Sequence, residues 1–238
     1  MIIIPAYNES KRLQNKKEEW GNILKKYQCI LVDDGSIDDT AEIAKSMGFK
    51  VIQLPKNKGK GEAIRRGMLE ALKYNPEYLL FADADLSCPE SEWVKLINEV
   101  VLNGIDVAIG SRYIKGAKAK RTLIRKIISK SFNIYTKIIL KMDYQDTQCG
   151  CKAFNRQSAM YIFGKPLTFE KFAVDLEILT RAEILGLKVK EVPITWNEES
   201  GTKIKIVKTS IELGKAVWEL KKIREIENTE TLISGHFF

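Results

Sequence analysis

The chain has 238 residues, of which 45% are hydrophobic and 29% charged, a composition typical of a folded globular domain. Its apolar runs are far shorter than the roughly 18 to 20 residues of a membrane-spanning helix, and no secretory leader pattern precedes the first strand, so we expect a cytoplasmic protein. The single histidine, His236, lies in the last three residues, which argues against hydrolases built on a Ser-His-Asp triad or a Cys-His pair.

The first half of the chain alternates short β-branched runs with charged stretches of helical length. This alternation predicts βαβ units on a mostly parallel sheet, that is, a doubly wound α/β fold over residues 1 to about 111. The predicted strands are Ile2–Ile4, Cys29–Val32, Lys50–Leu54, Tyr78–Ala82 and Asp106–Ile109. The predicted helices between them are Glu9–Tyr27, Asp38–Met47, Gly61–Tyr74 and Pro89–Leu102.

The second half begins with a long basic amphipathic stretch and continues with an irregular segment that contains glycine and cysteine. We then expect a helix at about Phe172–Leu185, a strand at Val189–Ile194 and a last helix at about Ile206–Glu225. Because no low-complexity or Pro/Ser-rich linker separates the halves, we expect one domain over residues 1–225 and a tail at 226–238. The four cysteines lack zinc-type spacing and are expected to be free thiols.

Two acidic side chains follow the predicted strand Tyr78–Ala82, in the triplet Asp83-Ala84-Asp85. Alternate positions of an extended chain point the same way, and a hard divalent cation takes carboxylate oxygens together with substrate phosphates. Alone, the triplet would equally suit an acidic turn that caps the next helix. Because ligands of open α/β sheets bind beyond the carboxyl ends of strands, its position favours a metal and phosphate site.

Other loops at strand ends carry residues suited to a nucleotide. The second strand runs into Asp33 and Asp34, either of which can accept a hydrogen bond from a base or a ribose. Alternatively the segment caps the following helix, through Ser36 or Asp38. The first strand runs into Pro5 and Tyr7, a rigid residue and one on which a base can stack. The loop Asn57–Glu62 is basic and rich in glycine, but its spacing differs from a P-loop and from a dinucleotide-binding motif.

Five short motifs follow one another along the chain in a recognisable order. They are Ile4-Pro5-Ala6-Tyr7-Asn8-Glu9, Val32-Asp33-Asp34-Gly35-Ser36, Asn57-Lys58-Gly59-Lys60-Gly61, Asp83-Ala84-Asp85-Leu86-Ser87 and Gly110-Ser111-Arg112. In this order they resemble family 2 glycosyltransferases of the GT-A fold, within which the chain is similar to the dolichyl-phosphate glucosyltransferase and dolichyl-phosphate mannose synthase group. The downstream segments Asp146–Lys152, Phe172–Glu177 and Val192–Trp196 favour the glucosyltransferase branch.

The resemblance implies a Rossmann-like GT-A sandwich, a mostly parallel central sheet flanked by helices. Residues 1–111 would then bind the nucleotide sugar, and residues 112–225 the acceptor. The positions that match the donor site of the family are Pro5, Tyr7, Glu9, Asp34, Lys60, Asp83, Ala84 and Asp85. Asp83 and Asp85 also match the positions that hold Mg²⁺ or Mn²⁺, whereas Ser87 replaces a glutamine that assists the metal in mannose-synthase relatives, which leaves a third protein ligand unassigned.

The resemblance also implies an inverting, metal-dependent transfer of a hexose to a polyprenyl or dolichyl phosphate, with UDP-glucose favoured as donor and GDP-mannose possible. Asp85 would be catalytic as a metal ligand, and Asp175 as a base or acceptor-orienting carboxylate, the alternative being an ordinary acid on a helix surface. Arg112 is the first candidate to receive the acceptor phosphate, because a guanidinium binds phosphate bidentately, and the alternative is a surface ion pair. Arg121 is the second candidate.

The positive net charge of +8 is concentrated in one stretch, since no acidic residue lies between Asp106 and Asp143. The basic residues there are Arg112, Lys115, Lys118, Lys120, Arg121, Arg125, Lys126, Lys130, Lys137 and Lys141. Apolar residues recur at helical spacing in the same stretch, at Ile124, Ile127, Ile128, Tyr135, Ile138, Ile139 and Met142. This predicts a basic amphipathic helix that either binds an anionic membrane surface peripherally, at its cytoplasmic face, or packs on the sheet with a solvated basic face.

Two other functions are compatible with part of the sequence. A cytosolic family 2 transferase that acts on a soluble sugar or protein would use the same donor motifs. A non-catalytic nucleic-acid-binding protein would use the basic stretch alone. The chain has no zinc-finger spacing, RNP-like aromatic motif or G-x-x-G clamp, so we expect no nucleic-acid partner.

Overall fold

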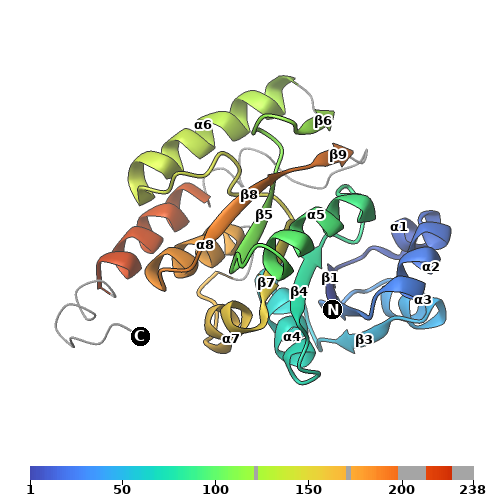
Figure 1. Cartoon of the computed structure of the whole chain (residues 1–238). Helices are drawn as coiled ribbons and strands as arrows, with labels where there is room; N and C mark the ends of the chain where they lie inside the picture. Colours follow the sequence, from blue (N-terminus) through green and yellow to red (C-terminus); the bar gives the residue numbers. More distant parts are fainter. Residues whose placement is uncertain (121–122, 170–172, 198–212, 227–238) are drawn as a thin grey trace.

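A seven-stranded sheet in the order β3-β2-β1-β4-β7-β5-β8 forms the centre of the molecule (Figure 1). The computed structural model describes residues 1–120, 123–169, 173–197 and 213–226, and the side chains of residues 120–128 are outside this description. The strands of the sheet are β1 (Ile2–Ala6), β2 (Cys29–Asp33), β3 (Lys50–Gln53), β4 (Tyr78–Ala82), β5 (Val107–Ser111), β7 (Cys151–Asn155) and β8 (Val189–Pro193). Strand β7 runs antiparallel to β4 and β5, and the other neighbours are parallel. The predicted α/β class is confirmed.

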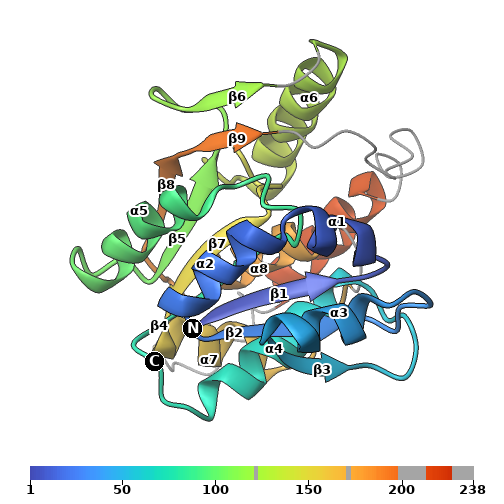
Figure 2. The same cartoon turned by 90° about the vertical axis from the view of Figure 1, so that its right-hand side faces the viewer.

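Helices cover both faces of this sheet, and the two layers can be followed in Figure 2. They are α1 (Ser10–Asn15), α2 (Lys17–Lys26), α3 (Thr40–Met47), α4 (Lys60–Leu72), α5 (Glu90–Val101), α6 (Leu123–Leu140), α7 (Arg156–Gly164) and α8 (Val174–Ile184). A small parallel pair, β6 (Lys118–Lys120) and β9 (Thr195–Asn197), lies apart from the main sheet. Residues 213–226 form a further helix, where the last helix was predicted.

The apolar residues of the strands alternate between two buried cores, because successive side chains of a strand point to opposite faces. Ile2 and Ile4 belong to one core, which includes Trp20 of α2 and Trp93 of α5, whereas Ile3 belongs to the other, which includes residues of α4, α7 and α8. All five of the residues in β1 are buried. Such strands, covered on both faces, read as continuous apolar runs rather than as alternating ones.

Two elements differ from the sequence prediction. The segment after the basic stretch was expected to be irregular, but Cys151–Asn155 is the strand β7, inserted between β4 and β5. Its fully buried Lys152 breaks the apolar pattern by which a central strand is recognised. The single helix expected over Glu9–Tyr27 is two helices, α1 and α2, because the backbone of Lys16 departs from helical geometry.

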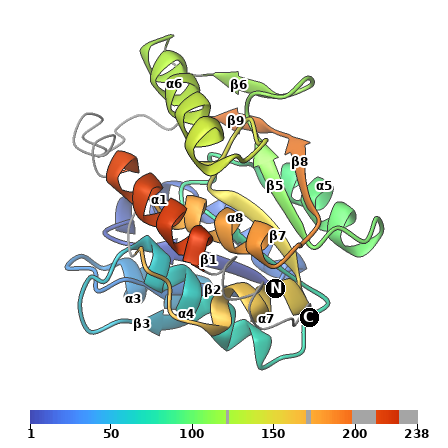
Figure 3. The same cartoon turned by 90° about the vertical axis from the view of Figure 1, so that its left-hand side faces the viewer.

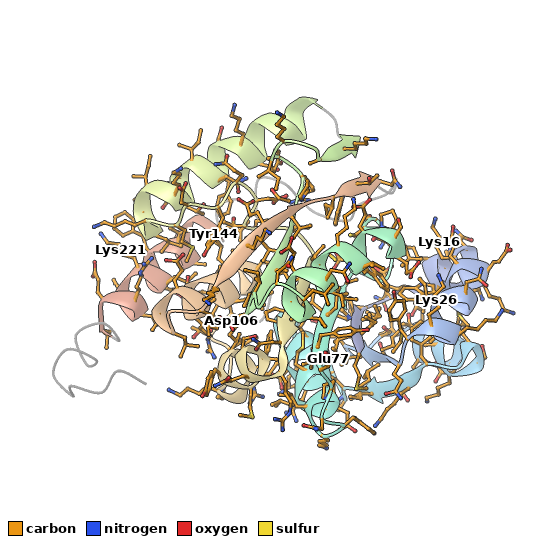
Figure 4. The ribbon with its side chains drawn as sticks, viewed as in Figure 1. Lys16, Lys26, Glu77, Asp106, Tyr144 and Lys221 are labelled. Carbon is orange, nitrogen blue, oxygen red and sulfur yellow. The ribbon has the colours of Figure 1, made fainter. Side chains whose placement is uncertain are left out.

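One end of the sheet carries hydrogen bonds that join neighbouring strands, and the other end carries the loops of the candidate site. At the amino ends of the strands, Glu77 and Asp106 precede β4 and β5 (Figure 4). The Asp106 carboxylate accepts hydrogen bonds from the side chain of Asn155 at 2.7 Å and from the backbone N–H of Lys188 at 2.8 Å, so it joins the beginning of β5 to β7 and β8. The opposite, carboxyl ends of β1, β2 and β4 carry the loops that form the candidate site.

Helix α6 and the helix of residues 213–226 lie next to each other beside α8 (Figure 3). Arg224 donates a hydrogen bond to the carbonyl of Leu140, and the hydroxyl of Tyr135 donates one to the carbonyl of Gly214 at 3.4 Å. Tyr144, labelled in Figure 4, donates from its hydroxyl to Glu183 of α8 at 2.6 Å. In the described part of the chain, every helix is too short or too polar to cross a membrane.

Candidate functional site

A cavity of about 390 Å³ opens at the carboxyl ends of β1, β2 and β4. It is lined by Pro5, Ala6, Tyr7, Glu9, Arg12, Asp34, Asn57, Gly59, Lys60, Ala63, Asp83, Ala84 and Asp85. All eight of the residues matched to a donor site from the sequence therefore meet in one place. The other five lining residues were not predicted; they are Ala6, Arg12, Asn57, Gly59 and Ala63. Ala6, Asn57 and Gly59 nevertheless belong to motifs described from the sequence.

The loop after β1 is held in place by the loop after β2. The backbone N–H of Asn8 donates to the hydroxyl of Ser36 at 2.9 Å, and the Asn8 side chain accepts from the backbone N–H of Ile37 at 3.0 Å. Asn8 has a left-handed backbone with φ of 54°, a conformation that asparagine tolerates better than most residues. This bend leaves the neighbouring Tyr7 side chain 42% exposed at the cavity, as stacking on a planar ring requires.

The carboxylate of Glu9 binds the guanidinium of Arg12, with Nη1 at 2.7 Å from both carboxylate oxygens. Both residues line the cavity. Arg12 lies one helical turn after Glu9 at the beginning of α1, so this pair is local in sequence. It places a positive charge at the edge of the cavity that the sequence motifs did not indicate.

Asp33 and Asp34 have different roles. Asp34 faces the cavity and accepts two short hydrogen bonds of 2.7 Å, from the backbone N–H groups of Lys58 and Gly59. Asp33 accepts from Ser36 within its own turn. The turn requires Gly35, because its φ is 68° and a Cβ there would lie 2.5 Å from the backbone of Lys56.

Asp83 and Asp85 were expected to point the same way from an extended chain. In the structure they reach the cavity through a turn instead. The backbone N–H of Leu86 donates to the carbonyl of Asp83 at 3.2 Å, and Leu86 has a left-handed φ of 55°. Leucine rarely adopts this conformation, and such strain is typical of functional loops. The turn carries both carboxylates to the cavity wall. Asp85 also accepts a hydrogen bond from the backbone N–H of Ser87 at 2.9 Å, and Ser87 itself is buried.

Lys60 at the beginning of α4 forms an ion pair with Asp83, with Nζ 2.8 Å from Oδ1. Burial lowers the pKa of Lys60, but the carboxylates of Asp83, Asp175 and Asp85 together raise it by more. The pKa of Lys60 therefore lies above its ordinary value. Burial raises the pKa of Asp83, and Asp85 and Asp175 add to this effect while Lys60 opposes it. The charges of Asp85 and Asp175 thus act on the same carboxylate as Lys60, and an additional cation beside Asp83 and Asp85 would be stabilised.

Asp175 lies in the first turn of α8 and is buried, with 4% of its surface exposed. Its carboxylate pairs with the ammonium of Lys152, which also donates to the carbonyl of Cys149 at 2.6 Å. Glu177, two residues further on, instead accepts from the backbone N–H groups of Thr168 and Phe169 at 2.8 Å and holds that loop. Asp175 is therefore not a surface acid, and Lys152 is a buried cation that sequence reasoning missed.

Arg112 lies at the end of β5 and does not line the cavity. Its guanidinium makes two hydrogen bonds to Asp146, at 2.6 Å from Nε and 2.8 Å from Nη2, and lies 4.9 Å from the ring centre of Trp196. Only 8% of the Arg112 side chain is exposed, so this is a buried ion pair and not a surface pair. Arg121, the second candidate for the acceptor phosphate, lies outside the described residues.

The residues at the cavity fit a divalent cation that is shared with a ligand. Among the described residues, no group of three or more His, Cys, Asp or Glu side chains has the geometry of a metal centre. Mg²⁺ is commonly held by one or two carboxylates together with substrate phosphates, and Asp83 and Asp85 supply two. Burial is the main cause of the raised pKa of Asp83, and the negative charges of Asp85 and Asp175 add to it, so a cation bound here would favour the ionised carboxylate.

The basic helix α6 presents two apolar faces. Tyr135, Ile139 and, just after the helix, Met142 pack against the core, which is the packing alternative for these three residues, whereas Ile138 of the same predicted stripe is 68% exposed. Ile134, one turn earlier on the same side, is 52% exposed. The exposed basic residues in this part are Lys130, Lys137 and Lys141. The remaining members of the predicted stripe, Ile124, Ile127 and Ile128, belong to side chains outside the description.

Comparison with known proteins gives one consistent result. The family described as "Glycosyl transferase family 2" matches residues 1–163. Dolichyl-phosphate beta-glucosyltransferase of Dictyostelium discoideum is 30% identical over 242 residues, which covers 92% of this chain and 73% of that protein. The Drosophila melanogaster protein of the same name is 35% identical over 239 residues, with 90% and 72% covered.

Solved structures share the architecture. Glucosyl-3-phosphoglycerate synthase from Mycobacterium tuberculosis, solved with Mn²⁺, UDP and glucosyl-3-phosphoglycerate, superimposes with a TM-score of 0.71 at 18% identity. The match covers 93% of this chain and 79% of that one. The same protein with Mn²⁺ and UDP-glucose gives a TM-score of 0.69 at 19% identity. At such identities the likeness extends to the fold alone.

Proposed function

Because this chain belongs to glycosyl transferase family 2 and is a glycosyltransferase, we propose that it transfers glucose from UDP-glucose to dolichyl phosphate or a related polyprenyl phosphate. The observation that carries the proposal is the cluster of Asp83, Asp85 and Lys60 in a cavity at the end of β4. The names of the relatives support glucose and a dolichyl phosphate acceptor. GDP-mannose is the second donor to test.

In this proposal the cavity binds the donor from its nucleoside end to its diphosphate. Pro5 and Tyr7 hold the base, and Glu9 and Asp34 stand near the ribose. Asp83 and Asp85 are the proposed ligands of Mg²⁺ or Mn²⁺, a cation that supplies positive charge to the departing diphosphate. Lys60 contributes the ammonium charge nearest to that position, since it already contacts Asp83.

The acceptor oxygen of a lipid phosphate needs little activation, because the second pKa of a phosphate monoester is about 6. We propose that this oxygen attacks the anomeric carbon from the face opposite the nucleotide, with inversion. Asp175 is the carboxylate proposed to orient the acceptor or to take a proton, and the support is its burial and its electrostatic interaction with Lys60 and Asp83. Arg112 is proposed for the acceptor phosphate. A guanidinium has five N–H donors, and the two bonds to Asp146 use two of them.

The proposed location is the cytoplasmic face of a membrane, where the protein binds peripherally. The support comes from α6, whose described part combines the exposed side chains of Ile134 and Ile138 with exposed lysines. A basic amphipathic helix of this kind suits an interface that contains anionic lipids.

The deciding experiment offers UDP-glucose or GDP-mannose with Mn²⁺ or Mg²⁺ and dolichyl phosphate, and measures both nucleoside diphosphate release and glycolipid. We expect glucolipid with UDP-glucose, and none from Asp85→Ala. Transfer to soluble sugars or proteins with no glycolipid would instead establish the cytosolic alternative. Mannolipid from GDP-mannose alone would overturn the donor assignment.

A further inference from the structure

Gly150 stands against the carboxylate of Asp83 so closely that no side chain fits. A Cβ at Gly150 would lie 2.0 Å from Oδ2, 2.7 Å from Cγ and 2.9 Å from Oδ1 of Asp83. Real Cβ atoms do not approach heavy atoms to less than 3.0 Å. The backbone of Gly150 is not in the left-handed region, so the glycine is needed here for space and not for its conformational freedom.

The sheet itself creates this contact. Strands β4 and β7 are antiparallel, and Ala82 lies opposite Cys151. The residue after Ala82 is therefore opposite the residue before Cys151, which brings Asp83 next to Gly150. Both positions lie just beyond the ends of the paired strands. The late strand β7 therefore reaches the donor cavity through its preceding glycine, although Gly150 does not line that cavity.

The Asp83 carboxylate is consequently held from two sides. Its Oδ1 is 2.8 Å from Nζ of Lys60, and its Oδ2 lies against Gly150. The three atoms nearest to a Cβ at Gly150 all belong to the Asp83 side chain. Since an aspartate side chain can rotate, a methyl group at position 150 would displace the carboxylate and leave the backbone of both strands in place.

We propose that Gly150 is a positioning residue that fixes the Asp83 carboxylate for donor binding. This inference rests on the proposed function only in so far as Asp83 serves the donor and its cation. Its structural part, the steric coupling between residues 150 and 83, is independent of any substrate.

The test is a double-mutant cycle of wild type, Gly150→Ala, Asp83→Ala and the double variant, with thermal midpoint and UDP affinity in the presence of Mn²⁺ as readouts. In the wild-type background, Gly150→Ala is expected to lower the midpoint by about 2–4 °C and to weaken UDP binding about tenfold or more. In the Asp83→Ala background the clashing atoms are gone, so Gly150→Ala is expected to lower neither quantity any further. Such non-additivity is the signature of two residues in contact.

Gly164→Ala is the control, because a Cβ at Gly164 meets nothing within 4 Å. It should leave UDP affinity unchanged and should not lower the midpoint, since alanine at the end of helix α7 is at least as stable as glycine. Equal loss of the midpoint from Gly150→Ala in both backgrounds, or UDP affinity like that of wild type in Gly150→Ala, would overturn the inference. If wild type binds no UDP and makes no glucolipid, the proposed function fails, while the midpoints still decide whether Gly150 acts through Asp83.

Discussion

The ammonium of Lys152 is buried against the carboxylate of Asp175, with 0% and 6% of the two side chains exposed. Lys152 comes from the antiparallel strand β7, opposite Phe81 of β4, and its Nζ lies 5.4 Å from the centre of that ring. The pair thus joins the middle of the sheet to α8.

Lys152→Met should destabilise the protein by about 3–5 kcal/mol, because it leaves the Asp175 carboxylate buried without its partner. Urea unfolding measures this loss. Lys190→Met is the control, since Lys190 pairs with Glu99 on the surface with 48% of its side chain exposed, and such pairs contribute about 1 kcal/mol or less. The double variant Lys152→Met/Asp175→Leu should recover part of the loss. Equal, small effects at both lysines would contradict the structural role of the buried pair.

Asp34→Ala should release the loop that carries Lys58 and Gly59, because the Asp34 carboxylate accepts both of its backbone N–H groups at 2.7 Å. We expect UDP affinity to fall at least tenfold and stability to fall by about 1–3 kcal/mol, the cost of leaving the buried N–H of Gly59 without its acceptor. Calorimetric titration with UDP and Mn²⁺ measures the first effect. Asp34→Asn keeps one acceptor oxygen and should fall between wild type and Asp34→Ala. A variant that binds UDP normally would exclude the loop from the donor site.

The sequence allowed the donor half of the site to be predicted because its residues lie at the ends of strands that are consecutive and parallel. Each motif reads as an apolar run followed by polar residues, and parallel strands bring those ends together. The contribution of β7 could not be predicted, since it depends on pairing with a strand about 70 residues earlier. Local patterns carry no information about such register. Lys152 and Gly150 therefore became visible only in the folded chain.

The same limit applies to the acceptor side. The resemblance singled out Arg112 but gave no indication that Asp146 would bind its guanidinium, because the two residues are brought together by the turn after α6. Similarly, helical spacing grouped Ile138 with Ile139, although adjacent residues of a helix lie about 100° apart and only one of them packs against the core. Periodicity identified the helix but did not decide which side is covered.

Asp85→Ala should abolish transfer while the fold is retained. It removes the hydrogen bond from Ser87, but the backbone bonds Leu86 N–H to Asp83 and Asn197 N–H to Ser87 still hold the turn. We expect loss of at least two orders of magnitude in glucolipid formation, the range found when one charge-stabilising group is removed from an active site. Excess EDTA should have the same effect on wild type, and Mn²⁺ should reverse it. Full activity in EDTA would exclude a catalytic divalent cation.

Asp38 should stabilise the loops around the cavity in a pH-dependent manner. Burial raises the pKa of Asp38, but hydrogen bonds from Thr40 and Ser10 outweigh this and lower it below its ordinary value of 3.8. A carboxyl group with a depressed pKa in the folded state contributes stability above its unfolded pKa, and the contribution is lost as the pH falls through the folded pKa. Asp38→Asn should therefore be less stable than wild type at pH 7, and the difference should shrink below about pH 4.

Urea midpoints between pH 3 and pH 7 measure this difference. Asp39→Asn is the control, because the neighbouring Asp39 makes no capping hydrogen bond with its side chain. A difference between wild type and Asp38→Asn that stays constant over the whole pH range would show that the hydrogen bonds do not depend on the charge of Asp38.

Binding to anionic vesicles should depend on the outward face of α6. Lys130, Lys137 and Lys141 are exposed there, and each basic residue near an anionic surface contributes about 1 kcal/mol, so the triple change to glutamine should weaken partitioning by up to about a hundredfold at low salt. Lys137 already pairs with Asp143, which reduces its contribution to vesicle binding.

The double change Ile134→Ser/Ile138→Ser should weaken vesicle binding at all salt concentrations, because it removes exposed apolar surface and not charge. Leu102→Ser replaces a similarly exposed apolar residue at the carboxyl end of α5, and it should have no effect on vesicle binding. If wild type itself fails to bind anionic vesicles at low salt, α6 packs on the sheet with a solvated basic face, and the acceptor must reach the site by another route.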